Sequence, residues 1–244
     1  MSHNNWGKEM VERKEQIYEG KSKTLYATGD KDKVIVYFRD DATAGDGLRK
    51  GVIKGKGEIN CTFCSIIYQK LERHGIPTHF IKQVSSNEQL CWKLDILPIE
   101  IIVRNIVAGH LASHLGIAEG TPLKHAVLEQ DYKNDALHDP MINLWHILAF
   151  GWATKAQYNR MNEMALKTNN FLKKFFDKRG IILVDFKLEF GKKGNKILLA
   201  DEITPDGCRL WDKATRKRLD KDRFRRNLGG IEEAYQEVLA RIQN

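Results

Sequence analysis

An alternation of apolar and charged residues near position 185 is the first place where this sequence could do chemistry. Residues 184–190 read Val-Asp-Phe-Lys-Leu-Glu-Phe. In a strand, successive side chains point to opposite faces of the sheet. Asp185, Lys187 and Glu189 would therefore line one face, and the apolar residues between them would pack against a core on the other.

A second strand could bring a further carboxylate to this charged face. A turn-rich segment at 191–195 precedes a strand expected over residues 196–203, which carries Asp201. If the register of the hairpin has the right parity, Asp201 joins the face. Carboxylates and an ammonium group would then converge at a place suited to oxygen-ligated Mg²⁺ beside phosphate. The alternative is a two-stranded ribbon whose outer face is solvated.

Two lysines near a glycine form a second candidate site. Lys21 and Lys23 follow Gly20 and alternate onto one face of an extended segment. Because glycine lets a backbone approach a ligand closely, a hairpin here could place two ammonium groups over phosphates. Position 15 is Glu, where a Walker A loop needs glycine, so the segment is not a P-loop. An exposed hairpin is the alternative.

Several other basic residues occur where we expect a nearby anion. Arg104 interrupts an apolar strand expected over residues 100–107, and burying an unpaired guanidinium there would be costly. Its partner could be a structural carboxylate or a ligand. Arg209, Lys221 and Arg225 belong to a basic segment and are the kinds of donor that bind phosphate and carboxylate.

Other reactive residue types give weaker signals. Cys61 and Cys64 form the only C-x-x-C motif, and no second pair accompanies them. His110 and His114 have the i, i+4 spacing of a zinc site, but no third ligand can be named. The sequence has no H-E-x-x-H or G-x-S-x-G motif, so covalent nucleophilic catalysis has no support.

Composition limits the class of protein. The chain has 244 residues, 42% of them hydrophobic and 30% charged, which suits one large domain or two small ones. No apolar run reaches the roughly 18 residues of a membrane span, and the start lacks the apolar region of a signal peptide. The four cysteines lack the spacing of a disulfide scaffold. We therefore expect a cytoplasmic protein that does not act on membranes.

The net charge of +8 favours polyanionic partners, either phosphorylated small molecules or nucleic acid. Much of the basic excess lies in residues 209–226, where Asp212, Asp220 and Asp222 interrupt it. Those carboxylates would weaken a surface built only for duplex binding. We therefore expect small-molecule partners rather than nucleic acid, with a solvated run of charges as the alternative for this segment.

The elements that must position these residues are grouped rather than alternating. The first third is rich in expected strands, and the later part contains most of the expected helices, so we predict an α+β fold with antiparallel sheets and a domain boundary near residue 95. Strands are expected over 17–26, 33–38 and 78–84, a loop over 40–47, and helices over 60–74, 108–115, 143–177 (one or two) and 231–242.

Eight segments, in order through nearly the whole chain, resemble the phosphoribosylaminoimidazole-succinocarboxamide synthase (SAICAR synthetase) family. They include the glycine hairpin, the strand with Arg104, and both segments that carry the candidate carboxylates. The matching segments are residues 18–26, 38–47, 55–60, 98–105, 115–123, 132–143, 183–191 and 201–212.

The resemblance implies an ATP-dependent ligase that joins carboxyaminoimidazole ribotide (CAIR) and L-aspartate. The products are SAICAR, ADP and phosphate, in de novo purine (IMP) biosynthesis. It implies a smaller β-rich nucleotide-binding domain over residues 1–95 and a larger α+β domain over residues 96–244 with the metal and substrate sites. ATP lies in the cleft between them, as in the related ATP-grasp and kinase architectures. The implied cofactors are ATP and Mg²⁺, and the implied assembly is a homodimer or another homo-oligomer.

The resemblance also implies roles for single residues. The residues implied in catalysis are Lys187, Glu189 and Asp201, of which Glu189 and Asp201 match the Mg²⁺ ligands. Nucleotide binding is implied for Lys21, Lys23, Lys133 and Lys187 at the phosphates and for Trp92, Lys93 and Leu94 around adenine. The positions implied to gather around CAIR are Arg104, His110, Asp185, Arg209, Lys221 and Arg225. His110 departs from the family, which usually has serine there.

Two other functions remain open on the sequence. A kinase that phosphorylates a small molecule would use the same ATP cleft and carboxylates, and phosphate release that depends strictly on aspartate would separate it from the ligase. A basic RNA-binding protein would instead show affinity for nucleic acid that falls steeply with salt. For the ligase we expect an acyl phosphate that aspartate's amine then attacks, with a concerted route as the alternative.

Overall fold

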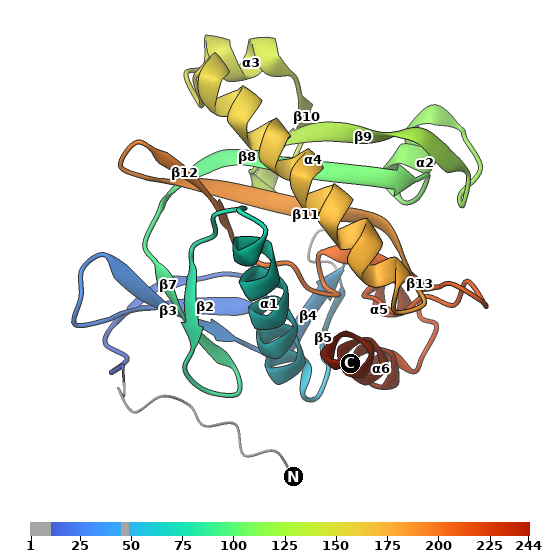
Figure 1. Ribbon diagram of the computed structural model, residues 1–244, viewed down its shortest axis with the longest axis horizontal. Helices are drawn as coiled ribbons and strands as arrows, with labels where there is room; N and C mark the ends of the chain where they lie inside the picture. The colour runs from blue at the N-terminus through green and yellow to red at the C-terminus, as the bar shows by residue number, and fades with distance from the viewer. Residues whose placement is uncertain (1–10, 45–48) are drawn as a thin grey trace.

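Two antiparallel sheets carry the fold of the computed structural model, which describes residues 11–44 and 49–244 (Figure 1). The first sheet has the strand order β1-β2-β3-β7-β6 and is built entirely from the first part of the chain. Its strands are β1 (Gln16–Glu19), β2 (Lys23–Ala27), β3 (Lys33–Phe38), β6 (Phe80–Gln83) and β7 (Glu88–Trp92).

The second sheet has the strand order β10-β9-β8-β11-β12, and β13 also pairs with β11. All these pairings are antiparallel, which confirms the predicted α+β class. The strands are β8 (Asp95–Ile106), β9 (Pro122–Tyr132), β10 (Met141–Ile142), β11 (Ile181–Lys193), β12 (Lys196–Ala200) and β13 (Cys208–Asp212).

A short ribbon replaces part of the loop predicted over residues 40–47. β4 (Asp41–Ala44) pairs with β5 (Arg49–Val52), and the side chains of Ala42 and Ala44 are buried. The loop prediction is therefore wrong for residues 41–44, where an alternation of small buried residues outweighs the turn-prone composition. Positions 45–47 of that prediction lie outside the described residues.

The helices cover the two sheets. α4 runs diagonally across the second sheet, and α1 lies over the first (Figure 1). The segment predicted to hold one or two long helices holds α3 and α4, separated at residues 150–154. The helices are α1 (Lys56–Arg73), α2 (His110–Leu115), η1 (Asp135–Leu137), α3 (Leu144–Ala149), α4 (Lys155–Asp177), α5 (Asp222–Arg225) and α6 (Ile231–Gln243).

α1 begins four residues earlier than the sequence pattern suggests, because a residue outside the helix caps it. The carboxylate of Asp40 accepts hydrogen bonds from the backbone N–H groups of Gly55, at 3.0 Å, and Gly57, at 2.8 Å. These are donors that a helix start leaves without an intrahelical partner. The hydrophobic period around residues 60–74 carries no sign of this distant cap.

β11 lies between two environments. Val184, Phe186, Leu188 and Phe190 are buried, and α4 packs on this strand. On the opposite face Asp185 and Glu189 are also buried, with only 3% and 4% of their surfaces exposed. A solvated ribbon would leave these carboxylates in water, so the fold rules out that alternative.

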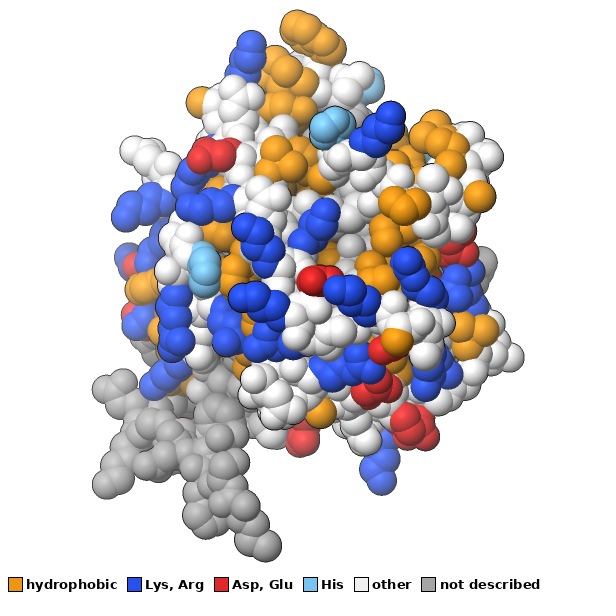
Figure 2. Space-filling model, turned by 45° about the vertical axis from the view of Figure 1, so that its right-hand side comes forward, with side chains coloured by type: hydrophobic (Ala, Val, Ile, Leu, Met, Phe, Trp, Pro, Cys, Tyr) orange, Lys and Arg blue, Asp and Glu red, His pale blue; other side chains and the backbone are white. Residues whose placement is uncertain are grey.

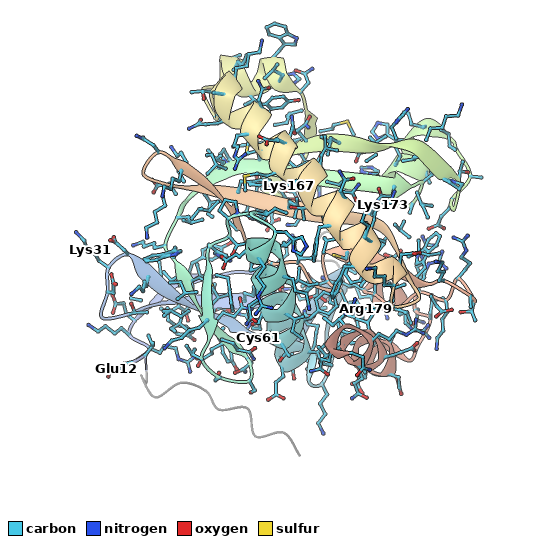
Figure 3. The ribbon with its side chains drawn as sticks, in the orientation of Figure 1. Glu12, Lys31, Cys61, Lys167, Lys173 and Arg179 are labelled. Carbon is cyan, nitrogen blue, oxygen red and sulfur yellow. The ribbon has the colours of Figure 1, made fainter. Side chains whose placement is uncertain are left out.

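The cysteines and the surface of α4 bear on the class of protein. The four cysteines are all buried and free, and Cys61 lies on α1 (Figure 3). The exposed side of α4 carries Lys167 and Lys173 (Figure 3). Among the described residues, no helix combines the length and the apolar character needed to cross a membrane.

Basic side chains are numerous on the surface but are not segregated. In the face shown in Figure 2, Lys and Arg side chains gather across the middle of the molecule, and Asp and Glu side chains lie among them. Several surface cations are paired, for example Lys213 with Asp177 and Arg160 with Glu163. On this face, the mixture of charges differs from the continuous basic stripe that is typical of duplex binding.

Candidate active site

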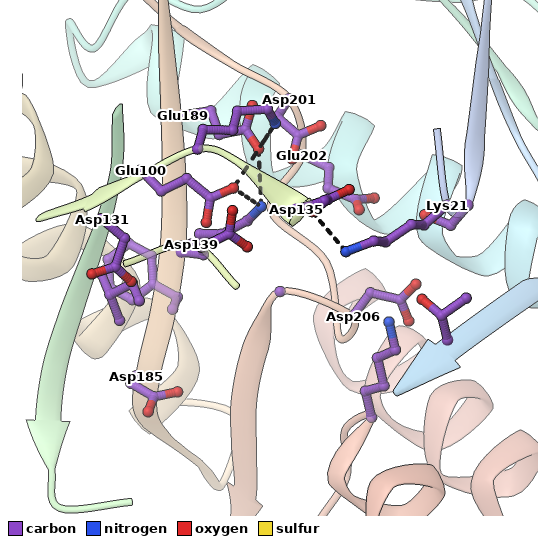
Figure 4. Close-up of a pocket in the computed structure, with 18 of the residues that line it drawn as sticks. Lys21, Glu100, Asp131, Asp135, Asp139, Asp185, Glu189, Asp201, Glu202 and Asp206 are labelled. Atoms are coloured by element: carbon purple, nitrogen blue, oxygen red, sulfur yellow. Dashed lines mark hydrogen bonds and ion pairs between the residues drawn. The ribbon is translucent and has the colours of Figure 1, made fainter. Parts of the chain in front are cut away.

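A cavity of about 850 Å³ opens where the β1–β2 turn faces the second sheet. Its wall includes side chains from β2, β8, β9 and β11 and from the segment 201–225, and Figure 4 shows part of it. It is lined by twelve of the residues that the sequence assigned to the site: Lys21, Lys23, Arg104, His110, Lys133, Asp185, Lys187, Glu189, Asp201, Arg209, Lys221 and Arg225.

Glu189 and Asp201 reach the same part of the cavity, although not for the reason expected. β11 and β12 pair with Glu189 opposite Ala200. Continuing that register would place position 201 opposite Leu188, on the apolar face. The register of the hairpin therefore does not have the parity that would put Asp201 on the charged face. Instead β12 ends at Ala200, and Asp201 has a left-handed backbone with φ of 59°. This local turn brings its carboxylate back to the charged face.

Lysine ammonium groups surround these two carboxylates. Glu189 accepts from Lys133 at 2.5 Å and from Lys187 at 2.9 Å, while Lys23 of β2 contacts Asp201 and also lies 3.2 Å from Glu202. Burial alone would lower the pKa of Lys187, but Glu189, Asp201 and nearby carboxylates raise it well above its ordinary value. Lys187 is therefore cationic and can bind an anionic ligand.

Glu100 belongs to the same cluster, and the sequence reasoning missed it. Its carboxylate accepts from Lys187 at 2.7 Å, and it lies directly opposite Glu189 across the β8–β11 pair. Burial raises the pKa of Glu100 to about 7 in spite of the nearby Lys187 charge. Its four-residue separation from Arg104 in one strand was the available signal, because both side chains then share a face.

The β1–β2 turn is tied to the opposite wall by an ion pair. Lys21 donates to Asp135 of η1 at 2.7 Å, as the dashed line in Figure 4 marks. The side chains of Lys21 and Asp135 are 46% and 64% exposed. Such a pair contributes little stability by itself, but it places the glycine hairpin over the lysine and carboxylate cluster.

The other half of the cavity is built from arginines. Arg104 is buried between Glu129, whose oxygen lies 2.6 Å from Nη2, and Asp185, which accepts from Nη1 at 2.8 Å. Arg209 donates to the same Asp185 oxygen at 2.9 Å and to Asp222 at 3.0 Å. Arg104 therefore has structural carboxylates as partners while it also lines the cavity.

Gly109 allows Arg209 to lie against the backbone at the start of α2. A Cβ atom added at Gly109 would come within 2.5 Å of Nη2 and 2.7 Å of Cζ of Arg209. The glycine also has φ of 56°, which side-chain-bearing residues rarely adopt. This close packing holds the guanidinium group against Gly109.

Lys221 differs from the other cations of the cavity. Within the part of the chain that the structure describes, no ion pair joins it to a carboxylate, whereas its neighbour Lys56 pairs with Asp206 at 2.7 Å. Burial, followed by the charges of Arg225 and Lys56, lowers the pKa of Lys221, although Asp206 opposes this. A cation in this position is suited to an anion supplied by a ligand.

The histidines and an extra aspartate lie at the rim. His110 and His114 both line the cavity, with ring centroids 5.3 Å apart. Asp131 of β9 is near them, and burial followed by the Glu129 charge raises the pKa of Asp131 to about 6, while His110 lowers it. Across residues 11–44 and 49–244, no three His, Cys, Asp or Glu side chains form a metal cluster.

The segment proposed for adenine lies apart from this wall. Trp92, Lys93 and Leu94 do not line the cavity among its described residues. The backbone N–H of Trp92 donates to His79 and that of Lys93 to Asp32. The segment connects β7 of the first sheet with β8 of the second. Its contact with adenine stays a prediction.

Comparisons with known proteins agree with one another. The family model described as SAICAR synthetase matches residues 16–242. The phosphoribosylaminoimidazole-succinocarboxamide synthase of Clostridium kluyveri is 53% identical over 96% of this chain and 100% of its own length.

Solved structures give the same result. The crystal structure of phosphoribosylaminoimidazole-succinocarboxamide synthase from Ehrlichia chaffeensis superposes with a TM-score of 0.92 at 46% identity, covering 94% of this chain and 98% of that one. A SAICAR synthetase solved in complex with ADP gives 0.90 at 49% identity, covering 93% and 97%.

Proposed function

The chain belongs to the SAICAR synthetase family, and from this premise we propose how its residues divide the work of the reaction. The protein is an ATP-dependent ligase that joins CAIR and L-aspartate to give SAICAR, ADP and phosphate in purine biosynthesis. This proposal rests on one observation: the two sides of the cavity differ in their charged residues. One side holds lysines with the carboxylates of Glu189 and Asp201, and the other holds arginines paired with buried aspartates.

The lysine side binds the phosphates of ATP. Lys21 and Lys23 come from the β1–β2 hairpin, and Lys133 and Lys187 come from the second sheet, so that the phosphates would be held from both walls. Ammonium groups neutralise the charge that spreads over the oxygens of a transferring phosphoryl group. Trp92, Lys93 and Leu94 are proposed to hold adenine through their backbone.

We assign Mg²⁺ to Glu189 and Asp201. Mg²⁺ is usually held by one or two carboxylates together with substrate phosphates, so this pair of hard oxygen donors is sufficient. Both carboxylates are kept ionised: burial alone would raise their pKa values, but Lys187 and Lys133 hold that of Glu189 below its usual range, and Lys23 holds that of Asp201. When bound, the ion would neutralise charge between the phosphates.

The arginine side binds CAIR. Arg104, Arg209, Arg225 and Lys221 are the cations for its phosphate and carboxylate, and Asp185 is available to accept from its amino group. With CAIR and ATP held in one cavity, a carboxylate oxygen of CAIR attacks the γ-phosphorus of ATP, the bond from that phosphorus to ADP breaks, and an acyl phosphate forms. The amine of aspartate then attacks the acyl carbon, phosphate leaves, and the amine loses a proton to give the amide. The chain contributes mainly orientation and preorganised charge.

A coupled assay of ADP release tests this proposal. CAIR and ATP would be supplied with each amino acid in turn, and ADP and phosphate should appear only with L-aspartate. Release of ADP without any amino acid, with a phosphorylated small molecule as product, would instead identify a small-molecule kinase. A product that contains aspartate would exclude the kinase.

We also propose the larger-scale assignments that the sequence suggested. The change from one sheet to the other between Trp92 and Asp95 supports a nucleotide-binding domain over residues 1–95 and a metal and substrate domain over residues 96–244.

Free, buried cysteines suit a cytoplasmic location. Trp145 of α3 and Phe150, directly after α3, are 75% and 66% exposed, which would give a homodimer or another homo-oligomer apolar contact area. Light scattering at several concentrations would test the assembly.

A further inference from the structure

One buried carboxylate gathers three guanidinium groups beside the cavity. Asp222 has 1% of its side-chain surface exposed. It accepts from Arg225 at 2.7 Å and from Arg209 at 3.0 Å, and Nε of Arg226 lies 3.6 Å from it. Burial alone would raise the pKa of Asp222, but Arg209 and Arg225 lower it below its ordinary value. The group is therefore an anion surrounded by cations.

Asp222 does not line the cavity, whereas Arg209 and Arg225 do. A guanidinium group has five N–H donors, and the carboxylate takes only one from each of these two arginines. Further donors of each group remain for the cavity side. Asp222 therefore lies behind the arginines relative to a bound substrate.

The position of Asp222 is itself fixed by the fold. Its backbone N–H donates to Asp220 at 2.7 Å, and the other oxygen of Asp220 accepts from the backbone of Leu210, also at 2.7 Å. Leu210 follows Arg209 in β13. The two arginines and their carboxylate are thus tied to one strand.

Ion pairs of Arg226 with Glu119 extend the same network toward α2. The carboxylate of Glu119, in the turn after α2, accepts from Arg226 through both oxygens, at 3.0 and 2.5 Å, and from Arg218 at 3.2 Å. Bidentate arginine pairs restrict geometry more than single contacts do. The α2 turn and the basic segment are therefore held together around Asp222.

We propose that Asp222 is a positioning residue that fixes Arg209 and Arg225 for binding of the anionic groups of CAIR. This inference rests on the proposed function, in which both arginines bind that substrate. Holding long side chains in place before binding removes part of the entropy cost of ordering them in the complex. Without the carboxylate, the two guanidinium groups would also repel each other.

The primary test replaces Asp222 with asparagine in the full-length enzyme. Asp222→Asn should raise the KM for CAIR about tenfold, because charge-assisted contacts that orient two donors are lost. The KM for ATP should stay within about twofold of wild type, and kcat should change less than the KM for CAIR. Equal changes in the KM values for CAIR and ATP would indicate a general structural role and overturn the proposal.

A matched control and a conservative variant separate positioning from folding. Asp212→Asn breaks the ion pair with Arg241 in the same segment, away from the cavity, and should leave the KM for CAIR unchanged. Asp222→Glu restores the charge one methylene farther out, so its KM for CAIR should lie between those of wild type and Asp222→Asn. If Asp222→Asn does not fold, an unchanged KM for CAIR in Asp222→Glu overturns the proposal.

A double-mutant cycle distinguishes failure of this inference from failure of the proposed function. If Asp222 acts through Arg209, the effect of Asp222→Asn on CAIR affinity should be smaller in an Arg209→Ala background than in wild type. Additive effects would overturn the positioning role while CAIR binding by Arg209 still stands. An Arg209→Ala enzyme with wild-type CAIR affinity would instead refute the substrate assignment on which the inference rests.

Discussion

The two halves of the cavity hold their charges differently. The half proposed for the nucleotide (the nucleotide half) pairs lysines with carboxylates, partly between the first and second parts of the chain, as in Lys23 with Asp201 and Lys21 with Asp135. The half proposed for CAIR (the CAIR half) pairs arginines with carboxylates within the second part of the chain, as in Arg104 with Asp185 and Arg209 with Asp222. Both halves are rich in ions, yet their chemistry and connectivity are not alike.

This difference shows which half can rearrange. An ammonium group is a compact charge on a flexible stem, whereas a guanidinium group is a rigid fork that a carboxylate can hold in one orientation. The lysines can therefore exchange carboxylate partners for phosphate oxygens. The arginines are already oriented, so the CAIR half should depend on geometry and the nucleotide half mainly on charge.

The largest expected effect tests the charge of the nucleotide half. Glu189→Gln keeps the size of the side chain but removes one carboxylate from the proposed Mg²⁺ pair, so turnover should fall by roughly 10² or more, because a lost metal contact removes several kcal/mol of transition-state stabilisation. The measurement is kcat at saturating Mg²⁺, with circular dichroism to confirm folding. Turnover near that of wild type would contradict the assignment of Glu189.

The next effect tests an oriented donor of the CAIR half. Arg209→Ala removes a group held by Asp185 and Asp222, and the loss of a charge-assisted donor costs roughly 1.5–3 kcal/mol, or about ten- to a hundredfold in affinity. Calorimetry with CAIR measures the change directly. ADP affinity, measured in the same way, serves as the control and should be nearly unaffected.

Geometry without any change of charge is tested at Gly109. Gly109→Ala would put a Cβ atom within 2.5 Å of the Arg209 guanidinium and would strain a backbone with φ of 56°. We expect CAIR affinity to fall by about tenfold because the fork must move, even though every charge remains. Gly116→Ala is a control for a positive φ without a clash, since its φ is 64° and nothing lies within 4 Å of the added atom. Its ψ of 22° is the left-handed helical value, whereas ψ of Gly109 is −134°, so its backbone strain is smaller.

If Gly116→Ala and Gly109→Ala weaken CAIR binding equally, a general disturbance of α2, rather than the contact with Arg209, would explain the loss. The comparison between the two halves would then lose its geometric part.

The same comparison shows which features of the site can be predicted from local sequence patterns. Alternation in residues 184–190 predicted the charged face of β11, and the bend at Gly20 predicted the hairpin that carries Lys21 and Lys23, because both are local patterns. The convergence of Asp201 followed from a left-handed residue after β12 rather than from register parity. A local pattern could not reveal that turn.

Partners that lie far apart in the chain were harder to predict. Arg104 plainly needed an anion, but nothing near it in the sequence identifies Glu129 or Asp185, which are 25 and 81 residues away. The acids at 220 and 222 looked like interruptions of a basic run. In the fold, Asp222 organises the arginines of that run. Only the pairing of β8, β9, β11 and β13 brings these groups together.

The smallest expected effect tests the rim of the CAIR half, at His110, where the family usually has serine. His110 lines the cavity beside His114 and near Asp131. If its ring contacts the CAIR phosphate, the protonated imidazole should bind the dianion better than the neutral ring does. CAIR affinity should then be higher at low pH, where the ligand-bound imidazole is protonated, than at high pH.

His110→Ser should flatten this part of the pH profile and change CAIR affinity by only a few-fold near neutral pH, since serine can still donate one hydrogen bond. Three other titratable groups lie nearby: His114, the CAIR phosphate, with a second ionisation near pH 6, and Asp131, whose pKa burial raises to about 6. These groups are present in the wild type and in the variant, but His110→Ser also removes the effect of His110 on the pKa of Asp131. The difference between the two calorimetric profiles therefore reports the imidazole both directly and through Asp131, and superimposable profiles would remove His110 from the phosphate site.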